Sequence, residues 1–180
     1  MDLAELHPIF VHVPLALLPA AVVLRIAHAV FPRAGLRIAA ILLLLAGVGF
    51  GLLAKESGEA AEHRAEQASR SVEDIRVAGS IPQLVADGSL LETHAELAEM
   101  TVLIFGLLLA AEAALLFLSY PAFARWRGTF SLPLPAQRIA GGLWIALAVA
   151  SLALVVLTGF YGGKLVYEHG VGVAQTSSQP

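Results

Sequence analysis

Four long apolar stretches dominate the chain, and polar connections separate them. Each stretch is about as long as a helix must be to cross a hydrocarbon core of ~30 Å. A backbone inside lipid has to satisfy its own hydrogen bonds, so only helices and closed barrels cross membranes, and these stretches are too long for barrel strands. The pattern therefore predicts an all-α fold, a bundle of four transmembrane helices. The apolar stretches cover residues 8–31, 38–54, 97–120 and 139–163.

Polar residues between the second and third stretches predict that both helices continue beyond the membrane. Residues 59–68 are rich in alanine and glutamate, which are good helix formers. Glycine and proline within residues 76–88 then predict a turn region. We expect a long helical outer hairpin here, within a single four-helix membrane domain of residues 1–173, and a disordered tail over 174–180. The expected helices are 8–31, 38–54 with an extension to about residue 70, 92–121 and 139–163.

Composition agrees with a membrane protein and excludes several kinds of site. Apolar residues make up 58% of the chain and charged residues 14%, whereas about a quarter of a soluble domain is charged. The absence of cysteine excludes disulfides, iron–sulfur clusters, thiolate zinc sites and covalently attached c-type haem. The first apolar stretch is too long for a signal peptide and follows acidic residues, so we expect it to be a retained helix.

Charge predicts the orientation of the bundle. The two short connections carry arginines and no acid, whereas every acid except Glu112 lies in the N-terminal segment, the long middle connection or the C-terminal segment. The positive-inside rule places arginine-rich short loops in the cytoplasm. We therefore expect a multi-pass protein of the bacterial inner membrane, with both termini on the periplasmic side. The arginines that lead to this prediction are Arg33, Arg37, Arg125, Arg127 and Arg138.

This orientation gathers every histidine except His28 on the outer side. A neutral imidazole is a ligand for metals and haem, and helical bundles often build such sites in their interior. His12 is the sharpest candidate because it lies about one turn inside the predicted membrane boundary, where polar groups are costly. Hydrogen bonding to a neighbouring helix explains His12 equally well. His94 lies among acids that also suit an ordinary helix start.

A set of candidate metal ligands follows from these positions. Glu59 and His63 are four residues apart on one helical face, which suits a metal ion but also an ordinary solvated face. A glycine-rich segment over residues 162–173 could fold over the outer mouth and carry His169 to it. The predicted metal ligands are His12, His94, His169, Glu59 and His63.

Two charges lie deep inside the predicted membrane helices. Arg25 and Glu112 reach similar depths, because the first and third helices run in the same direction. We predict an ion pair or shared polar network between them, with His28 as a possible third member. An intramembrane carboxylate also raises the possibility of a transport path. Structural pairing is the favoured interpretation, because no second acid lies in the core.

The ends of the second and fourth helices show a weak similarity. Each contains Gly-Phe, followed by lysine, glutamate and glycine, over residues 49–58 and 159–170. This similarity suggests two related helical hairpins, although chance could also produce it.

The two ends of the chain resemble a bacterial membrane-protein family known as domain of unknown function 2231. The resemblance rests on His-Pro-Ile-Phe-Val-His-Val-Pro-Leu-Ala-Leu at residues 7–17 and Gly-Gly-Lys-Leu-Val-Tyr-Glu-His-Gly-Val-Gly-Val at residues 162–173, with His94 also matching. Val13 stands where the family usually has phenylalanine. The resemblance implies a four-helix membrane module, often near respiratory or cytochrome genes, and no established activity. Its histidine-rich ends would map a haem or metal site onto His7, His12, His94 and His169.

Two functions are consistent with these patterns. The first is a membrane protein that binds haem b or a metal ion through outer-face histidines and exchanges electrons with a periplasmic carrier. The alternative is a non-catalytic accessory subunit of a larger respiratory or photosynthetic membrane complex, since glycine-rich helices permit close contacts with neighbouring helices. Neither a hydrolase nucleophile nor a nucleic-acid-binding surface is evident, so an enzyme is not expected. The lipid bilayer is the one partner that both functions share.

Overall fold

The computed structural model describes residues 3–75, 88–128 and 132–168, and four long helices make up most of them. The long helices are α1 (Leu3–Val30), α2 (Ala34–Ile75), α3 (Gly88–Ser119) and α5 (Leu134–Tyr167), and the short elements are η2 (Pro121–Phe123) and α4 (Ala124–Arg127). Each long helix contains a span that is long and apolar enough to cross a membrane. The predicted all-α fold with four membrane helices is therefore confirmed. The predicted turn region and disordered tail lie outside the described residues.

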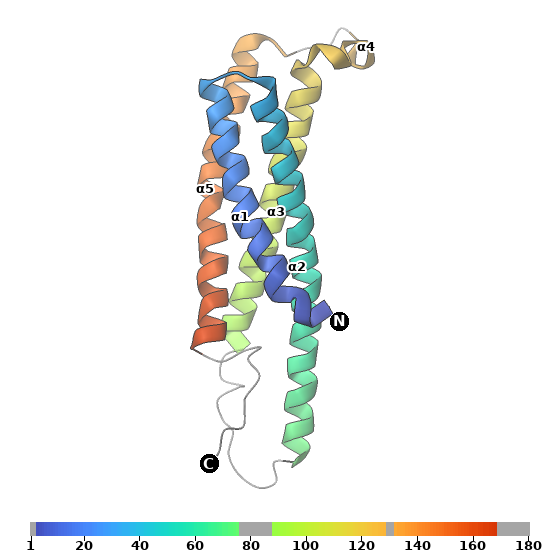
Figure 1. Cartoon of the computed structure of the whole chain (residues 1–180), viewed down its shortest axis with the longest axis vertical. Helices are drawn as coiled ribbons and strands as arrows, with labels where there is room; N and C mark the ends of the chain where they lie inside the picture. Colours follow the sequence, from blue (N-terminus) through green and yellow to red (C-terminus); the bar gives the residue numbers. More distant parts are fainter. Residues whose placement is uncertain (1–2, 76–87, 129–131, 169–180) are drawn as a thin grey trace.

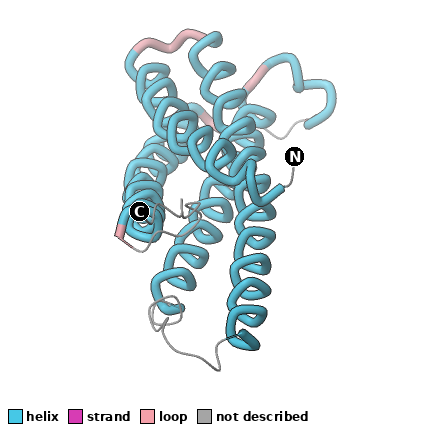
Figure 2. Tube along the Cα trace, turned by 60° about the horizontal axis from the view of Figure 1, so that its bottom comes forward, coloured by secondary structure: helices cyan, strands magenta, loops and turns pink. Residues whose placement is uncertain are grey.

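The long helices run alternately in opposite directions along one bundle (Figure 1). α1 packs against α2 and α5, and α3 packs against the same two helices, so the order around the bundle is α1, α2, α3, α5. Figure 2 shows the same helices from another side, without any strand among the described residues. We call the end with the connection at residues 31–33 and with η2 and α4 the arginine end. The opposite end, where His7 and His94 lie, is the histidine end.

The helices are longer than the apolar stretches. α2 has 42 residues, which corresponds to about 63 Å at 1.5 Å per residue. This is about twice the thickness of the hydrocarbon core, so α2 projects past the other helices at the histidine end (Figure 1). The predicted extension to about residue 70 reaches Ile75. The helix α5 is also longer than predicted, because it continues through the glycines at 162 and 163 to Tyr167. We had expected the segment from residue 162 onward to leave the helix and fold over the outer end of the bundle.

The core is narrow, and most apolar side chains face outward. Phe105, Leu18 and Leu44 are almost fully buried along the bundle axis. Leu107 and Val156, in contrast, are more than half exposed, as expected for side chains that face lipid. Because lipid is as apolar as leucine, close packing rather than the hydrophobic effect has to hold these helices together.

The buried positions repeat along the chain. Arg25 of α1 and Glu112 of α3 are 87 residues apart, and further pairs of buried residues in these two helices have the same separation. Four buried residues of α2 likewise correspond to four buried residues of α5 at one constant spacing. The corresponding pairs are Leu18 and Phe105, Ala21 and Leu108, Arg25 and Glu112 in α1 and α3, and Ala40 and Trp144, Leu44 and Ala148, Gly47 and Ser151, Gly51 and Val155 in α2 and α5.

The two hairpins α1–α2 and α3–α5 are therefore two copies of one packing pattern. The register of this repeat differs from the one suggested by the Gly-Phe similarity, which matched Gly49 with Gly159. Gly49 is exposed, with nothing within 4 Å of an added Cβ atom, so its position is not set by packing. The structural repeat instead matches Gly58 with Gly162, both of which lie against an imidazole.

A close approach of α1 and α2 at Gly47 leads to a first prediction. A Cβ atom on Gly47 would lie 2.6 Å from Leu18 Cδ2. We expect Gly47→Leu to lower stability by about 1–3 kcal/mol, because overpacked cores force side chains and backbone to shift. The measurement is the midpoint of thermal unfolding in detergent. Gly49→Leu is the matched control and should leave the midpoint unchanged. A normal midpoint for Gly47→Leu would show that the two helices do not approach this closely.

Candidate functional site

At the histidine end, His7 joins α1 to α2. Its Nδ1 atom donates a hydrogen bond to the carbonyl of Ala54 at 3.0 Å and lies 3.0 Å from Ser57 Oγ. Ser57 is fully buried, and its hydroxyl donates to the same carbonyl at 2.9 Å. The imidazole is thus held by two groups of the neighbouring helix rather than by its own helix.

His94 joins α3 to α5 in the same way. Its Nδ1 atom donates to the carbonyl of Thr158 at 3.0 Å. The Thr158 hydroxyl lies 3.2 Å from the hydroxyl of Thr101, which also belongs to α3. Each hairpin of the repeat therefore contains one histidine that bonds to a carbonyl of its partner helix.

A glycine lies beneath each imidazole. A Cβ atom on Gly58 would be 3.1 Å from His7 Cε1, and one on Gly162 would be 2.9 Å from His94 Cε1. In both hairpins, the glycine comes four residues after the residue whose carbonyl accepts the bond, and so lies on the same helix face. The two histidine sites are built alike, and each needs glycine for the ring to approach.

The carbonyl acceptors determine which nitrogen of each ring carries a hydrogen. A carbonyl oxygen only accepts, so Nδ1 must be the protonated nitrogen, and in the neutral ring Nε2 keeps its lone pair. Among the described residues, neither Nε2 atom has a hydrogen-bond partner. Histidines that bind metals are commonly held in this way, with the other ring nitrogen donating to a carbonyl or carboxylate.

The other predicted ligands that the structure describes form no metal-binding group with these two rings. His12 is exposed on α1, and its Nδ1 atom donates to the carbonyl of Pro8 in the same helix. Glu59 and His63 are exposed on α2, where the Glu59 Oε1 atom lies 3.9 Å from Lys55 Nζ. His169 lies outside the described residues. Within the part of the chain that is described, no three histidine, cysteine or acidic side chains could share a metal ion.

A second polar cluster lies toward the arginine end and centres on Glu112, which is 1% exposed. One carboxylate oxygen, Oε2, accepts from Arg25 Nε at 3.1 Å, and the other, Oε1, accepts from Arg37 Nε at 2.6 Å. Arg37 also donates from Nη1 to Ser119 Oγ at 3.0 Å. One buried carboxylate thus links α3 to both helices of the first hairpin.

Trp144 brings α5 into the same cluster. The Arg25 guanidinium lies 5.6 Å from the centre of the indole ring, within the range of a cation–π contact. The indole Nε1 donates to the carbonyl of Leu108 at 2.7 Å. Next to it, a Cβ atom on Gly141 would lie 3.2 Å from Arg25 Nη2, so a small residue is needed where the guanidinium passes. All four long helices therefore contribute to this cluster.

The cluster contains the predicted pair and one residue that we had placed elsewhere. Arg25 and Glu112 form the expected ion pair. Arg37, expected in the connection between the first two helices, instead lies in the first turn of α2 and bonds to Glu112, because α2 begins at Ala34. His28 does not join the network, since its Nδ1 atom donates to the carbonyl of Arg33. The sequence does contain a signal for Arg37: Glu112 is the one acid deep inside the apolar stretches, and both Arg25 and Arg37 lie at a depth where they could pair with it.

The comparisons with known proteins concern the whole bundle. The chain matches the family described as "Predicted membrane protein (DUF2231)" over residues 4–175. It belongs to this family. Neither a curated protein nor a solved structure matches it. The DUF2231 match confirms the resemblance inferred from the two end motifs, and it includes both hairpins with His7, His94 and the Glu112 cluster.

The buried carboxylate leads to a second prediction. Glu112→Gln leaves two guanidinium groups without their shared anion, and breaking a buried ion pair costs about 3–5 kcal/mol. We expect a clearly lower unfolding midpoint in detergent. Glu99→Gln is the matched control, because it removes the same charge from an exposed pair with Lys55, and exposed pairs contribute little. Equal stability of the two variants would contradict a stabilising role for the cluster.

Proposed function

We propose that this protein binds a b-type haem at the histidine end, where His7 and His94 would hold it, and that it transfers electrons there. The observation that supports the proposal is the matched pair of imidazoles. Each is held through Nδ1 by a carbonyl, and each has an Nε2 atom without a partner in the described part of the chain. Each ligand comes from a different hairpin, so the proposed site lies between the two copies of the repeat.

The number of ligands favours haem over a bare metal ion. A protein-bound zinc ion takes three or four protein ligands, and no such group exists among the described residues. Haem iron already has the four ring nitrogens and needs only one or two protein ligands. The absence of cysteine restricts the proposal to non-covalent haem. Bound haem would supply an iron that accepts and returns single electrons.

The residues of this chain would fix the ligands before the group binds. The carbonyls of Ala54 and Thr158 hold the two rings in one tautomer, and hydrogen bonds to Nδ1 raise the basicity of the ligating nitrogen. Gly58 and Gly162 leave room for the rings to lie against the helices. Rigid ligands of this kind limit the rearrangement that accompanies a change of iron charge.

The proposal includes an orientation in which the histidine end faces the periplasm. The support comes from the distribution of exposed charge. Arg33, Arg125 and Arg138 are exposed at the arginine end, whereas Glu56, Glu92 and Glu96 are exposed at the histidine end. By the positive-inside rule, the arginine end belongs in the cytoplasm of a bacterial cell. Electrons would then be exchanged with a carrier at the outer face.

An accessory role in a larger membrane complex is the second candidate. A groove of about 360 Å³ lies between α2 and α3, lined by apolar side chains and by the Lys55–Glu99 pair. Gly106 in this groove has nothing within 4 Å of an added Cβ atom, which would allow a partner helix to approach closely. Purification in mild detergent as a stable monomer would count against this role. The two candidate functions are compatible.

The haem proposal predicts a specific pattern of absorption spectra. The protein purified from cells supplied with haem precursor should show a Soret band, and His7→Ala and His94→Ala should each reduce bound haem by at least about tenfold. This follows the order of magnitude for disturbed metal sites. His12→Ala and His63→Ala are matched controls, because both residues are exposed, and both should keep the band.

Two results would overturn this proposal. One is a wild-type protein that binds no haem when haem is supplied. The other is a wild-type protein that contains a bound metal ion but shows no Soret band, and that loses this metal in both His94→Ala and His169→Ala. Such a result would instead indicate a bare metal site that includes a residue outside the described part of the chain.

The proposed orientation predicts the labelling of introduced cysteines, since the chain has none of its own. A membrane-impermeant thiol reagent should label Glu92→Cys in bacterial cells with a permeabilised outer membrane. Arg125→Cys should react only after the inner membrane is also opened. Both side chains are exposed, so access differs only by the side of the membrane. Labelling in the reverse order would show the opposite orientation.

A further inference from the structure

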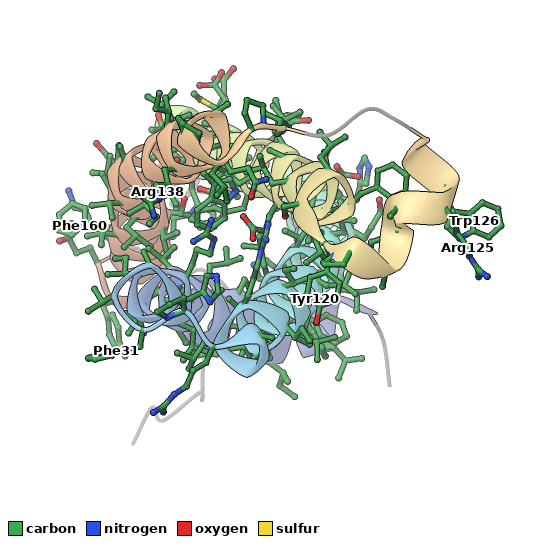
Figure 3. The ribbon with its side chains drawn as sticks, turned by 90° about the horizontal axis from the view of Figure 1, so that it is seen from above. Phe31, Tyr120, Arg125, Trp126, Arg138 and Phe160 are labelled. Atoms are coloured by element: carbon green, nitrogen blue, oxygen red, sulfur yellow. The ribbon has the colours of Figure 1, made fainter. Side chains whose placement is uncertain are left out.

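A pocket of about 440 Å³ opens at the arginine end, beside the Glu112 cluster. It lies between the α1–α2 connection, the end of α3 and the beginning of α5, and η2 forms part of its wall. Figure 3 views the bundle from this end, with Arg125 and Trp126 of α4 pointing away from the four long helices. The polar residues that line the pocket are His28, Arg37, Ser119, Tyr120 and Gln137.

The protein does not balance the positive charge beside this pocket. Arg25 and Arg37 share the single carboxylate of Glu112. No other acid occurs between residues 6 and 55 or between residues 100 and 167 of the sequence, so no second acid is available near this end from any of the four helices. The cluster therefore carries an excess of one positive charge, next to a pocket that is also partly lined by Arg37.

This excess charge cannot be removed by losing a proton. An arginine stays protonated in proteins, and the Arg37 side chain is only 13% exposed. Arg37 uses Nε for Glu112 and Nη1 for Ser119, while Nη2 has no partner among the described residues. A poorly solvated cation of this kind favours a counter-anion, and a guanidinium suits the oxygens of a phosphate group.

The walls of the pocket suit a lipid better than a small ion. Apolar side chains, including Ile38, Leu116 and Phe123, line it together with the polar ones. A headgroup phosphate at Arg37 could thus be accompanied by apolar contacts to the rest of the lipid. Basic pockets between transmembrane helices at the cytoplasmic side are suited to acidic lipid headgroups. The exposed Arg33 and Arg138 at the same end add long-range attraction for an anionic lipid.

We propose that this pocket binds the phosphate headgroup of an acidic phospholipid, with Arg37 as its main contact. The negative charge of the phosphate would neutralise the one positive charge that Glu112 does not. It would also tie the α1–α2 connection to the ends of α3 and α5, where the pocket lies. This site is separate from the histidine end and does not depend on whether haem binds there.

The experiment is a lipid titration of the purified, detergent-solubilised protein, followed by thermal unfolding and native mass spectrometry. Short-chain phosphatidylglycerol is the acidic probe, short-chain phosphatidylcholine is the neutral probe, and inorganic phosphate is the free anion. We expect phosphatidylglycerol to bind at least about tenfold more tightly than phosphatidylcholine and to raise the unfolding midpoint. Inorganic phosphate at the same concentration should do neither.

Three variants distinguish the pocket from general surface charge. Arg37→Gln keeps the Arg25–Glu112 pair and should abolish the preference for phosphatidylglycerol. Arg125→Gln removes the same charge from an exposed position on α4, and this variant should retain the preference for phosphatidylglycerol. Ala122→Trp fills the pocket without changing any charge, so it tests the site even if Arg37→Gln fails to fold. We expect this variant to lose the preference as well.

Several results would overturn the proposal. An equal loss in Arg37→Gln and Arg125→Gln would assign the preference to surface charge. A retained preference in Ala122→Trp would place the lipid elsewhere. Binding of inorganic phosphate as tight as that of phosphatidylglycerol would show a site for the free anion rather than for a lipid.

Discussion

A charged carboxylate inside a membrane bundle must be paired, and this requirement determines how the four helices meet at the arginine end. Glu112 accepts one hydrogen bond from α1 and one from α2, while Arg25 lies against Trp144 of α5. A rotation of any one of these helices about its axis would move a charged or indole group away from its partner. Since apolar packing alone discriminates weakly between rotations in lipid, this cluster supplies much of the orientational information that the apolar surfaces lack.

The two ends of the bundle use their polar groups differently. At the arginine end, the Arg25–Glu112 pair connects one hairpin to the other. At the histidine end, His7 and His94 each bond within their own hairpin, to Ala54 and Thr158 respectively. The buried polar groups thus tie the hairpins together at one end, while at the other the two histidines bond within their own hairpins and the exposed Lys55–Glu99 pair joins α2 to α3. A ligand held by both Nε2 atoms would add a second connection between the hairpins to this exposed ion pair.

The sequence was enough to predict the number of helices and the depth of a residue in the membrane. It was not enough to predict how each helix is rotated about its axis. The apolar runs determined the number of helices, and counting residues along two parallel helices was enough to pair Arg25 with Glu112. Arg37 was missed because the start of α2 was placed four residues too late, and a residue assigned to a connection is not considered as a partner inside the bundle. His12 attracted attention by its depth, yet its face of α1 is exposed. Depth follows from the sequence, but the face that a helix buries depends on its neighbours, and helices that are apolar all round give no periodic signal.

The repeat explains why one end has matched residues and the other has opposite ones. Equivalent positions of the two hairpins lie in corresponding places, and two identical charges brought together in a low-dielectric bundle would repel each other. The positions of Arg25 and Glu112 are equivalent, and they carry opposite charges that attract. The positions of His7 and His94 are also equivalent, but both carry histidine. Two neutral imidazoles do not repel as two charges would, so identity is tolerated there. The presence of histidine at both equivalent positions also allows one ligand to be held from two sides. This is the physical reason to look for function between the two histidines.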